Sequence, residues 1–276
     1  MKNLYTVFIN FNSGNQLFEG VMSVAKLPSV SGIIVVDNGS KDQSLDYLKK
    51  IKTDKITIIK NPKNLGFYKA VNMGIKKAFK KKADLVMPLD FDLDFSSDFI
   101  SRLLKVDADV VAPVLKFKRD GKWVYDCGGK VSLIIGRSTH LEKDKPLSSS
   151  EAALSSSDKG SPNWYDFVSG GCTIIKKEVI EKIGYFDEEY FVYYGDTDFA
   201  IRAKNAGFKV VADPNTIVHH KLEIAKQTKN IRKLKIALSD NLTFINKWVP
   251  WYFKPLAYSY IGLLSMKVIL NFYLQG

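Results

Sequence analysis

Short apolar runs alternate with segments of helical periodicity through the first hundred residues. Four runs, rich in β-branched, aliphatic and aromatic side chains, predict buried strands at residues 5–11, 32–36, 56–59 and 85–89. Between these runs, apolar residues recur at helical spacing. Strands that alternate with helices through short links predict βαβ units. We therefore expect an α/β fold with a mostly parallel central sheet and helices on both faces.

The pattern changes after about residue 109. Further strands are predicted at residues 110–117, 123–135, 164–175 and 209–212, and helices at 176–183, 196–206 and 223–247. Residues 147–161 are poor in apolar side chains and predict a loop. We expect one domain over residues 1–221, with halves at 1–108 and 109–221. Residues 222–276 would form a basic and aromatic helical C-terminal extension.

The C-terminal extension has two interpretations. Residues 256–274 are mostly apolar and close to the length of a membrane span, but they are only weakly hydrophobic and carry Lys267. Aromatic residues next to a basic helix are typical of a segment that lies in the bilayer interface. Residues 223–276 would then bind an anionic membrane surface. A pair of helices that packs on the core would have the same pattern.

Three acids follow the predicted strand at residues 85–89 at alternate positions: Asp90, Asp92 and Asp94. On a strand, side chains at i and i+2 point to the same face, so the three carboxylates would crowd together. A hard cation such as Mg²⁺ or Mn²⁺ would relieve their repulsion. The alternative is an Asp-rich surface turn before a helix. Asp37 ends another predicted strand, at the sheet edge where parallel α/β folds bind ligands.

Net charge and cysteine usage narrow the class of partner and the compartment. Lys and Arg number 41 against 29 acids, a net charge of +12. This excess implies an anionic partner, unless the lysines only form a solvated surface. No nucleic-acid-binding motif is recognisable, so we expect no nucleic-acid partner. The two cysteines lie far apart and suggest neither a zinc site nor a disulfide framework, which favours a reduced, cytoplasmic setting.

Four stretches together resemble the nucleotide-sugar glycosyltransferases of family 2, which have the GT-A fold. They are Val35-Val36-Asp37-Asn38-Gly39-Ser40-Lys41-Asp42, Asn61-Pro62-Lys63-Asn64-Leu65-Gly66-Phe67, Asp90-Phe91-Asp92, and Gly170-Gly171-Cys172 followed by Gly184-Tyr185-Phe186-Asp187-Glu188 and Tyr194-Gly195-Asp196-Thr197-Asp198. Asp90-Phe91-Asp92 stands in the place of the family's DxD motif. The resemblance covers roughly residues 4–221 and implies a Rossmann-like central sheet. The stretch from Asn64 to Phe67 is most similar to rhamnosyltransferases.

The resemblance implies a donor site at the carboxyl ends of the first strands. Asp37 would accept the imide N–H of uracil or thymine, and Asn10 and Asn12 would line the base and the ribose. Asn64 and Gly66 would flank the nucleoside. Helix capping is the alternative role for Asp37, Asn10 and Asn12.

The resemblance also implies a metal site and a catalytic base. Asp90 and Asp92 would hold Mn²⁺ or Mg²⁺ on the donor diphosphate, with Asp92 as the more direct ligand. His220 would lie near the metal, with His219 as the competing choice and a purely structural role as the alternative for either. Asp196 matches the acid that serves as general base in relatives.

Further residues would lie on the acceptor side of this site. They are Gly170, Gly171 and Asp198. Asp198 would be a partner of Asp196, the base itself, or an acid that orients the following helix.

Two positions depart from the family's pattern. Relatives often carry Glu where this chain has Gly195, and small residues where it has Tyr68-Lys69. The missing acid leaves open a non-catalytic nucleotide-sugar or glycan-binding module. A sugar-phosphate nucleotidyltransferase would share the alternating fold and the acid pair, but residues 8–16 lack its Gly-rich phosphate loop.

These observations lead to one principal expectation. The chain would be an inverting, metal-dependent glycosyltransferase of the hexosyltransferase type, acting in polysaccharide biosynthesis. Its donor would be a UDP- or dTDP-sugar, and its acceptor a glycan or a lipid-linked saccharide. It would be cytoplasmic and peripheral at the inner face of the cell membrane.

Overall fold

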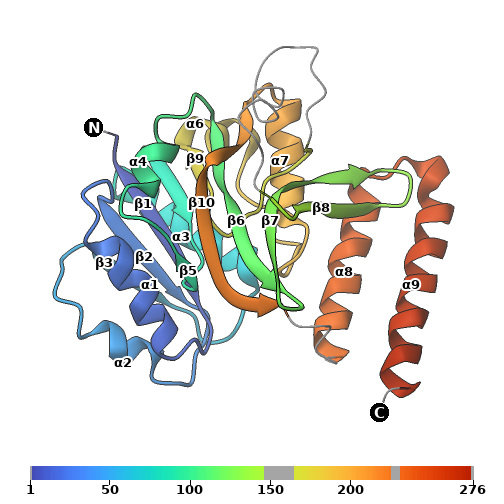
Figure 1. The fold of residues 1–276 in the computed structure, drawn as a ribbon, viewed down its shortest axis with the longest axis horizontal. Coiled ribbons are helices and arrows are strands. Elements are labelled where there is room, and N and C mark those ends of the chain that lie inside the picture. The colour runs from blue at the N-terminus through green and yellow to red at the C-terminus, as the bar shows by residue number, and fades with distance from the viewer. Residues whose placement is uncertain (1, 146–164, 225–230, 275–276) are drawn as a thin grey trace.

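The computed structural model describes residues 2–145, 165–224 and 231–274. In this part of the chain one sheet runs in the order β3-β2-β1-β4-β9-β6-β10-β5, with the hairpin β7–β8 attached to β6 (Figure 1). Neighbours β1–β2, β1–β4, β2–β3 and β6–β10 are parallel, whereas β9 is antiparallel to both β4 and β6. The mostly parallel sheet expected from the sequence is confirmed.

The N-terminal half keeps the predicted alternation of strands and helices. Its elements are β1 (Leu4–Asn10), α1 (Asn15–Ala25), β2 (Gly32–Asp37), α2 (Ser44–Leu48), β3 (Ile56–Lys60), α3 (Phe67–Lys80) and β4 (Leu85–Pro88). Each strand is short and sends alternate side chains to opposite faces. In β2, for example, Ile34 and Val36 enter one apolar cluster while Ile33 and Val35 enter the other.

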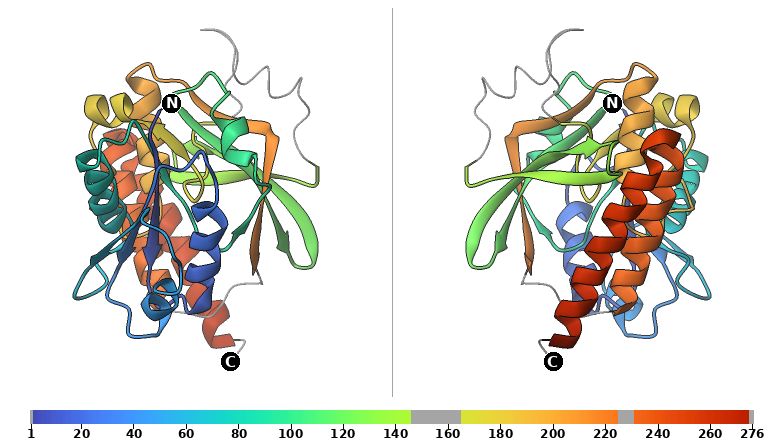
Figure 2. Two further views of the ribbon diagram at one scale, coloured as in Figure 1. Left: turned by 90° about the vertical axis from the view of Figure 1, so that its left-hand side faces the viewer. Right: turned by 90° about the vertical axis from the view of Figure 1, so that its right-hand side faces the viewer.

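These two clusters cover both faces of the sheet. Residues of α3, α6 and α7 contribute to one cluster, and residues of α1, α2 and α4 to the other. Figure 2 shows the two helical layers on either side of the strands. The expectation of helices on both faces is therefore confirmed.

The middle of the chain is more irregular than the sequence predicts. Its elements are β5 (Leu93–Asp94), α4 (Phe99–Leu103), β6 (Val110–Arg119), β7 (Lys122–Ser132), β8 (Arg137–Lys143), β9 (Ile174–Lys176), α6 (Lys177–Ile183), α7 (Gly195–Asn205) and β10 (Val210–Ile224). The strand predicted at 164–175 is wrong over most of its length: only β9 is regular, and Phe167 and Cys172 form isolated bridges. Residues 147–161, predicted as a loop, lie outside the described residues.

Two other predicted boundaries are also wrong. The strand predicted at 209–212 continues to Ile224, because β10 resumes its pairing with β6 beyond an irregularity between Asp213 and Ile217. The helix predicted at 223–247 therefore begins later, as α8 (Ile231–Trp248). The extra length of β10 matters for the site, since it carries both His219 and His220.

The chain ends in a pair of helices. After α8, a 3₁₀ turn, η1 (Trp251–Phe253), leads into α9 (Lys254–Leu274), and the two helices run antiparallel (Figure 1). They share a small apolar cluster formed by Ile245, Val249, Ala257 and Ile261. Among the described helices, none has the length and apolar character that a membrane crossing needs.

Candidate functional site

Asp37 ends β2 and is held by its neighbours at the carboxyl edge of the sheet. Its Oδ1 accepts a hydrogen bond from Asn10 Nδ2 at 2.8 Å, and its Oδ2 accepts one from the Ser40 N–H at 3.3 Å. Asn10, at the end of β1, has no exposed surface, and its amide also donates to Ser44 Oγ at 2.7 Å. Asn10 is thus placed to orient the Asp37 carboxylate.

Asn12, Asn64 and Gly66 tie together the loops around this edge. The Oδ1 of Asn12 accepts from the Lys41 N–H at 2.8 Å, and the Oδ1 of Asn64 accepts from the Gly66 N–H at 2.9 Å. Gly66 has φ +94°, and a Cβ there would lie 3.1 Å from the Phe191 carbonyl oxygen. A side chain at this position would be strained and crowded. These three residues therefore lie on loops at the strand ends where Asn10 and Asp37 also lie.

Asp90, Asp92 and His220 form a cluster that could hold a metal ion. One ligand atom from each residue lies within 4.8 Å of the other two, and His220 Nε2 is 3.4 Å from Asp92 Oδ1. The pairing of β10 with β5 sets His220 opposite Leu93, directly after Asp92. His219 points elsewhere: its ring lies 5.0 Å from that of Trp123. The structure therefore brings His220 to the two acids.

The three acids do not share the face of one strand, contrary to the prediction from the sequence. β4 ends at Pro88, and Phe91-Asp92 form a turn before β5. Asp94 lies in β5 and is exposed. A turn, and not a shared strand face, therefore brings Asp90 and Asp92 together.

The electrostatics of this cluster suit a divalent cation. Burial, followed by the charges of Asp92 and Asp196, raises the pKa of Asp90 to about 7. Two carboxylates and an imidazole form a donor set that binds Mn²⁺ and, through its oxygens, Mg²⁺. A bound cation would favour the charged form of Asp90 that burial disfavours. The residues present thus fit the metal that the sequence implies.

Gly171 packs against Asp90, and Gly170 packs against Asp196. A Cβ on Gly171 would lie 2.1 Å from Asp90 Oδ2, and one on Gly170 would lie 2.9 Å from Asp196 Cβ. The Gly171 carbonyl accepts the Asp90 N–H at 2.8 Å, and the Gly170 N–H donates to Asp196 Oδ2 at 3.2 Å. The absence of side chains lets this irregular segment run between both carboxylates.

Asp196 lies in the first turn of α7. Its Oδ1 accepts the Thr197 N–H at 2.7 Å, and its own N–H donates to the Tyr68 hydroxyl oxygen at 3.1 Å. Burial raises the pKa of Asp196, while His140 opposes this rise. The charge of Asp196 in turn helps to raise the pKa of Asp90. The acid predicted as the base thus lies within electrostatic reach of the metal cluster.

Asp198 has a different environment. It is fully buried, with its Oδ2 2.8 Å from Arg202 Nε and its Oδ1 2.8 Å from both Trp248 Nε1 and Lys247 Nζ. These partners connect α7 to α8. Of the roles considered for Asp198, the orientation of the helix is the one that its contacts support.

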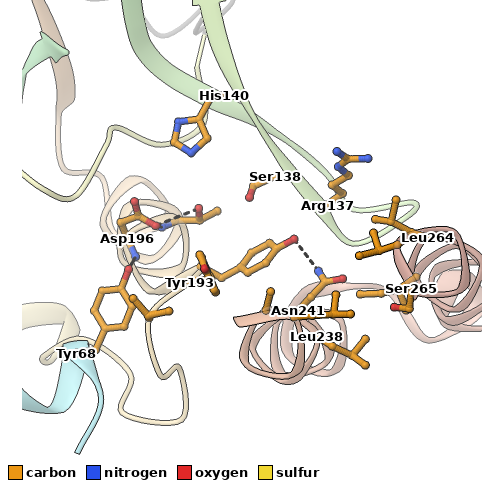
Figure 3. A pocket seen from close by; sticks show the side chains of 17 residues that line it. Tyr68, Arg137, Ser138, His140, Tyr193, Asp196, Leu238, Asn241, Leu264 and Ser265 are labelled. Carbon is orange, nitrogen blue, oxygen red and sulfur yellow. Dashed lines mark hydrogen bonds between the residues drawn. The ribbon is translucent and has the colours of Figure 1, made fainter. Parts of the chain in front are cut away.

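Sequence reasoning did not find the cavity beside Asp196. Its volume is about 380 Å³, it opens to the surface, and it is shown in Figure 3. Tyr68, His140 and Asp196 lie at one end, and leucines of α8 and α9, including Leu238 and Leu264, lie at the other. The cavity therefore joins a polar, titratable end to a largely apolar wall that also carries Arg137, Asn241 and Ser265.

Comparisons with known proteins point to one family. The model of glycosyl transferase family 2 matches residues 6–184. A dTDP-rhamnosyl transferase of Shigella flexneri is 27% identical over 223 residues, which cover 79% of this chain and 69% of the relative. An N-acetylglucosaminyl-diphospho-decaprenol L-rhamnosyltransferase of Mycobacterium tuberculosis is 24% identical over 286 residues, covering 96% of this chain and 91% of the relative.

Two solved structures share the fold. GalNAc-T7 with UDP, GalNAc and Mn²⁺ superposes with a TM-score of 0.69 at 18% identity, covering 94% of this chain. The present chain spans 50% of that longer protein. The mannosyltransferase PcManGT from Pyrobaculum calidifontis, in complex with GDP-Man and Mn²⁺, gives a TM-score of 0.60 at 14% identity, covering 98% of this chain and 73% of that one.

Proposed function

The chain belongs to glycosyl transferase family 2 and has the GT-A fold, and on this premise we propose that it is a metal-dependent, inverting transferase of sugars from a nucleotide-sugar donor. The observation that carries the proposal is the arrangement of two acidic centres. The cluster of Asp90, Asp92 and His220 would bind the donor diphosphate through a cation, and Asp196 lies beside it at the head of a cavity.

We propose a pyrimidine nucleotide, dTDP or UDP, as the carrier of the sugar. Asp37 is a carboxylate at the sheet edge that can accept the imide N–H of thymine or uracil. The hydrogen bonds from Asn10 and Ser40 fix its orientation for that role. Two relatives are named as rhamnosyl transferases, one of them with dTDP in its name, which supports a dTDP-linked deoxyhexose as the first donor to test.

Asp90, Asp92 and His220 would hold Mn²⁺ or Mg²⁺. Such a cation supplies Lewis-acid neutralisation of the charge on a departing nucleoside diphosphate. The turn at Phe91-Asp92 and the pairing of β10 with β5 fix the three side chains before the donor binds. This preorganisation avoids the cost of collecting like charges during the reaction.

Asp196 is the proposed general base. Its carboxylate would take the proton of an acceptor hydroxyl while that oxygen attacks the anomeric carbon. The bond to the diphosphate breaks on the opposite face, so the configuration inverts. Burial raises the pKa of Asp196, which makes it a stronger base, and the N–H groups of Thr197 and Gly170 hold its two oxygens in place.

The acceptor would be a saccharide, and the cavity favours one attached to a lipid. Its polar end at Asp196 suits a sugar hydroxyl, and its wall of α8 and α9 side chains suits an apolar chain. Outside the cavity, α9 and η1 expose large apolar side chains, with Trp251 80% exposed. Together with the net charge of +12, this surface supports a cytoplasmic location at the inner face of the membrane.

The test is a transfer assay with UDP- and dTDP-sugars, lipid-linked and free saccharide acceptors, and Mn²⁺ or Mg²⁺. Asp196→Asn should reduce the transfer rate by about 10²–10⁴-fold, the range typical of a general base, while donor binding in a thermal-shift assay persists. Asp92→Ala should lose the metal-dependent shift as well as the transfer.

Lys177→Gln serves as a control, because it removes an exposed charge paired with Glu181 on α6. Transfer at the wild-type rate by both active-site variants would overturn the assignment. Metal-dependent donor binding without transfer to any acceptor would indicate a binding module. Pyrophosphate release from a sugar phosphate and a nucleoside triphosphate would indicate a nucleotidyltransferase.

A further inference from the structure

The polar end of the cavity contains a titratable side chain that the proposed mechanism does not use. His140 projects from β8, and its Nδ1 lies 2.8 Å from Asp126 Oδ2 on β7. Asp126 is buried, and its carboxylate also accepts the Ser169 hydroxyl at 2.7 Å and the Gly128 N–H at 2.9 Å. The partner of His140 is therefore itself fixed by two further hydrogen bonds.

These contacts define how the imidazole is held. Asp126 accepts hydrogen bonds from its other neighbours, so His140 Nδ1 carries a proton and donates it to the carboxylate. The ring of Phe167 meets the imidazole edge-on at 5.2 Å and 87°. A side chain at a cavity edge would otherwise sample several rotamers. Here the ring orientation is set before any substrate arrives.

His140 and Asp196 influence each other across this end of the cavity (Figure 3). The pKa of His140 is raised although burial lowers it, because Asp126, Asp196 and Glu142 favour the imidazolium. In the opposite direction, His140 lowers the pKa of Asp196 against the effect of burial. The cationic ring thus favours the charged carboxylate.

The other charged groups around Asp196 either disfavour its charged form or lie further along the cavity. Asp126 raises the pKa of Asp196, and the charge of Asp196 acts in turn on Asp90 and on the Tyr68 phenol of α3. Arg137 also lines the cavity, but its guanidinium contacts the Tyr260 hydroxyl of α9. Among the groups described as acting on Asp196, His140 is the cation.

We propose that His140, locked by Asp126 and Ser169, is a positioning residue of the transfer site whose imidazolium keeps Asp196 ionised and ready to accept a proton. The inference rests on the proposed function in one respect: it takes Asp196 to be the base. Two residues of the β7–β8 hairpin, His140 and Asp126, would then support the base without contacting the substrate.

The sign of the pH effect follows from the two groups. Transfer requires charged Asp196, so the rate falls as the pH falls through the pKa of this acid. His140 is cationic below its own raised pKa, and at low pH its positive charge opposes the protonation of Asp196. Loss of the cation should therefore move the acidic limb of the rate profile to higher pH. Well above both pKa values, the rate should return to the wild-type value.

The first experiment measures transfer between pH 5 and 9 for the wild type, His140→Gln and Asp126→Asn. We expect His140→Gln to be slower by about tenfold at the acidic end, with the deficit shrinking towards the alkaline end. Asp126→Asn removes the partner of His140 but also a negative charge that raises the pKa of Asp196, so its acidic limb should move less than that of His140→Gln. Lys177→Gln, which removes a charge outside the cavity, should leave the profile in place. A uniform loss at every pH, or no loss at any pH, would overturn the proposal.

The second experiment does not depend on transfer. The chain has three histidines, so NMR titration of the ring signals, assigned with His→Gln variants, reports on His140 directly. Replacing Asp196 by Asn should lower the titration midpoint of His140, because a favourable negative charge is lost. An unchanged midpoint would show that the two groups are not coupled. If the wild type transfers no sugar but Asp196→Asn still shifts the titration midpoint of His140, the proposed function is rejected. The coupling between His140 and Asp196 is then retained.

Discussion

Gly195 and Tyr68 are complementary in space, although they are far apart in the sequence. A Cβ on Gly195 would lie 2.4 Å from Tyr68 Cε2. Tyr68 is buried on α3, stacks on Phe186 with ring centroids 5.5 Å apart, and accepts the Asp196 N–H. The ring thus occupies the space beside the first residue of α7. We predict that Gly195→Ala changes stability with opposite signs depending on the residue at position 68.

Two opposing effects set the change in the free energy of unfolding caused by Gly195→Ala. Carbon atoms in contact prefer a separation of about 3.5–4.0 Å, so the added methyl group must displace the ring or the start of α7. Overpacking of this kind costs about 1–3 kcal/mol. Replacing Gly by Ala in a helix gains at most about 1 kcal/mol. Gly195→Ala alone should therefore destabilise the protein by about 1–2 kcal/mol.

In a Tyr68→Ala background the clash disappears while the helix preference remains. Gly195→Ala should then be neutral or stabilising by up to about 1 kcal/mol. The coupling free energy between the two sites should be about 1–3 kcal/mol. Urea unfolding of the wild type, both single variants and the double variant measures it.

A matched control is Gly262→Ala in α9, where a Cβ would meet nothing within 4 Å. That substitution should be neutral or slightly stabilising in either background. Tyr68→Phe keeps the ring, so Gly195→Ala should remain destabilising in its presence. Additive effects, with a coupling below about 0.5 kcal/mol, would refute the argument that these positions share one space.

Three further predictions concern the metal cluster and α8. Asp92→Ala and His220→Ala should each weaken Mn²⁺ binding at least about tenfold in calorimetric titrations, because each removes a ligand; binding at wild-type strength would place the ion elsewhere. Mn²⁺ affinity should fall as the pH drops below about 7, since a proton then competes for Asp90, and Asp90→Asn should flatten this dependence. Asp240→Ala should lower the free energy of unfolding by about 2–4 kcal/mol, as it strands three backbone N–H groups, whereas exposed Asp94→Ala should change it by less than about 0.5 kcal/mol.

The sheet, and the strand ends at which a ligand was expected, could be predicted because both depend on local sequence patterns. Each strand of the N-terminal half is a short apolar run, and each helix lies between two such runs. Parallel strands place their carboxyl ends at one edge, so Asp37 and Asp90 could be assigned there without coordinates. The expectation that these residues lie at one functional edge needed only the order of the elements.

Contacts between distant segments could not be predicted in the same way. The turn that joins Asp90 to Asp92 replaces a strand that the pattern favoured, and His220 reaches them because β10 continues past an irregularity. His140 carries no local signal, since Asp126 and Asp196 approach it only when the sheet and α7 are assembled. Gly195 and Tyr68 looked like independent departures from the family pattern, yet they are two sides of one contact.

The C-terminal helices connect the proposed base to the proposed acceptor cavity. Asp240 on α8 accepts the N–H groups of Phe191, Val192 and Tyr193, just before the turn that begins α7. Asn241, the next residue, donates to the Tyr194 hydroxyl at 2.8 Å. The segment that presents Asp196 is thus anchored from α8.

The same two helices supply the apolar wall of the cavity, through side chains such as Leu238 and Leu264. A movement of α8 would therefore alter both the shape of the proposed acceptor cavity and the placement of Asp196. This coupling gives a physical reason for an acceptor or a membrane surface that engages α8 and α9 to affect turnover as well as binding. It follows that substitutions on the cavity face of α8 should change kcat and KM together, whereas those on exposed positions of α9 should act on KM alone.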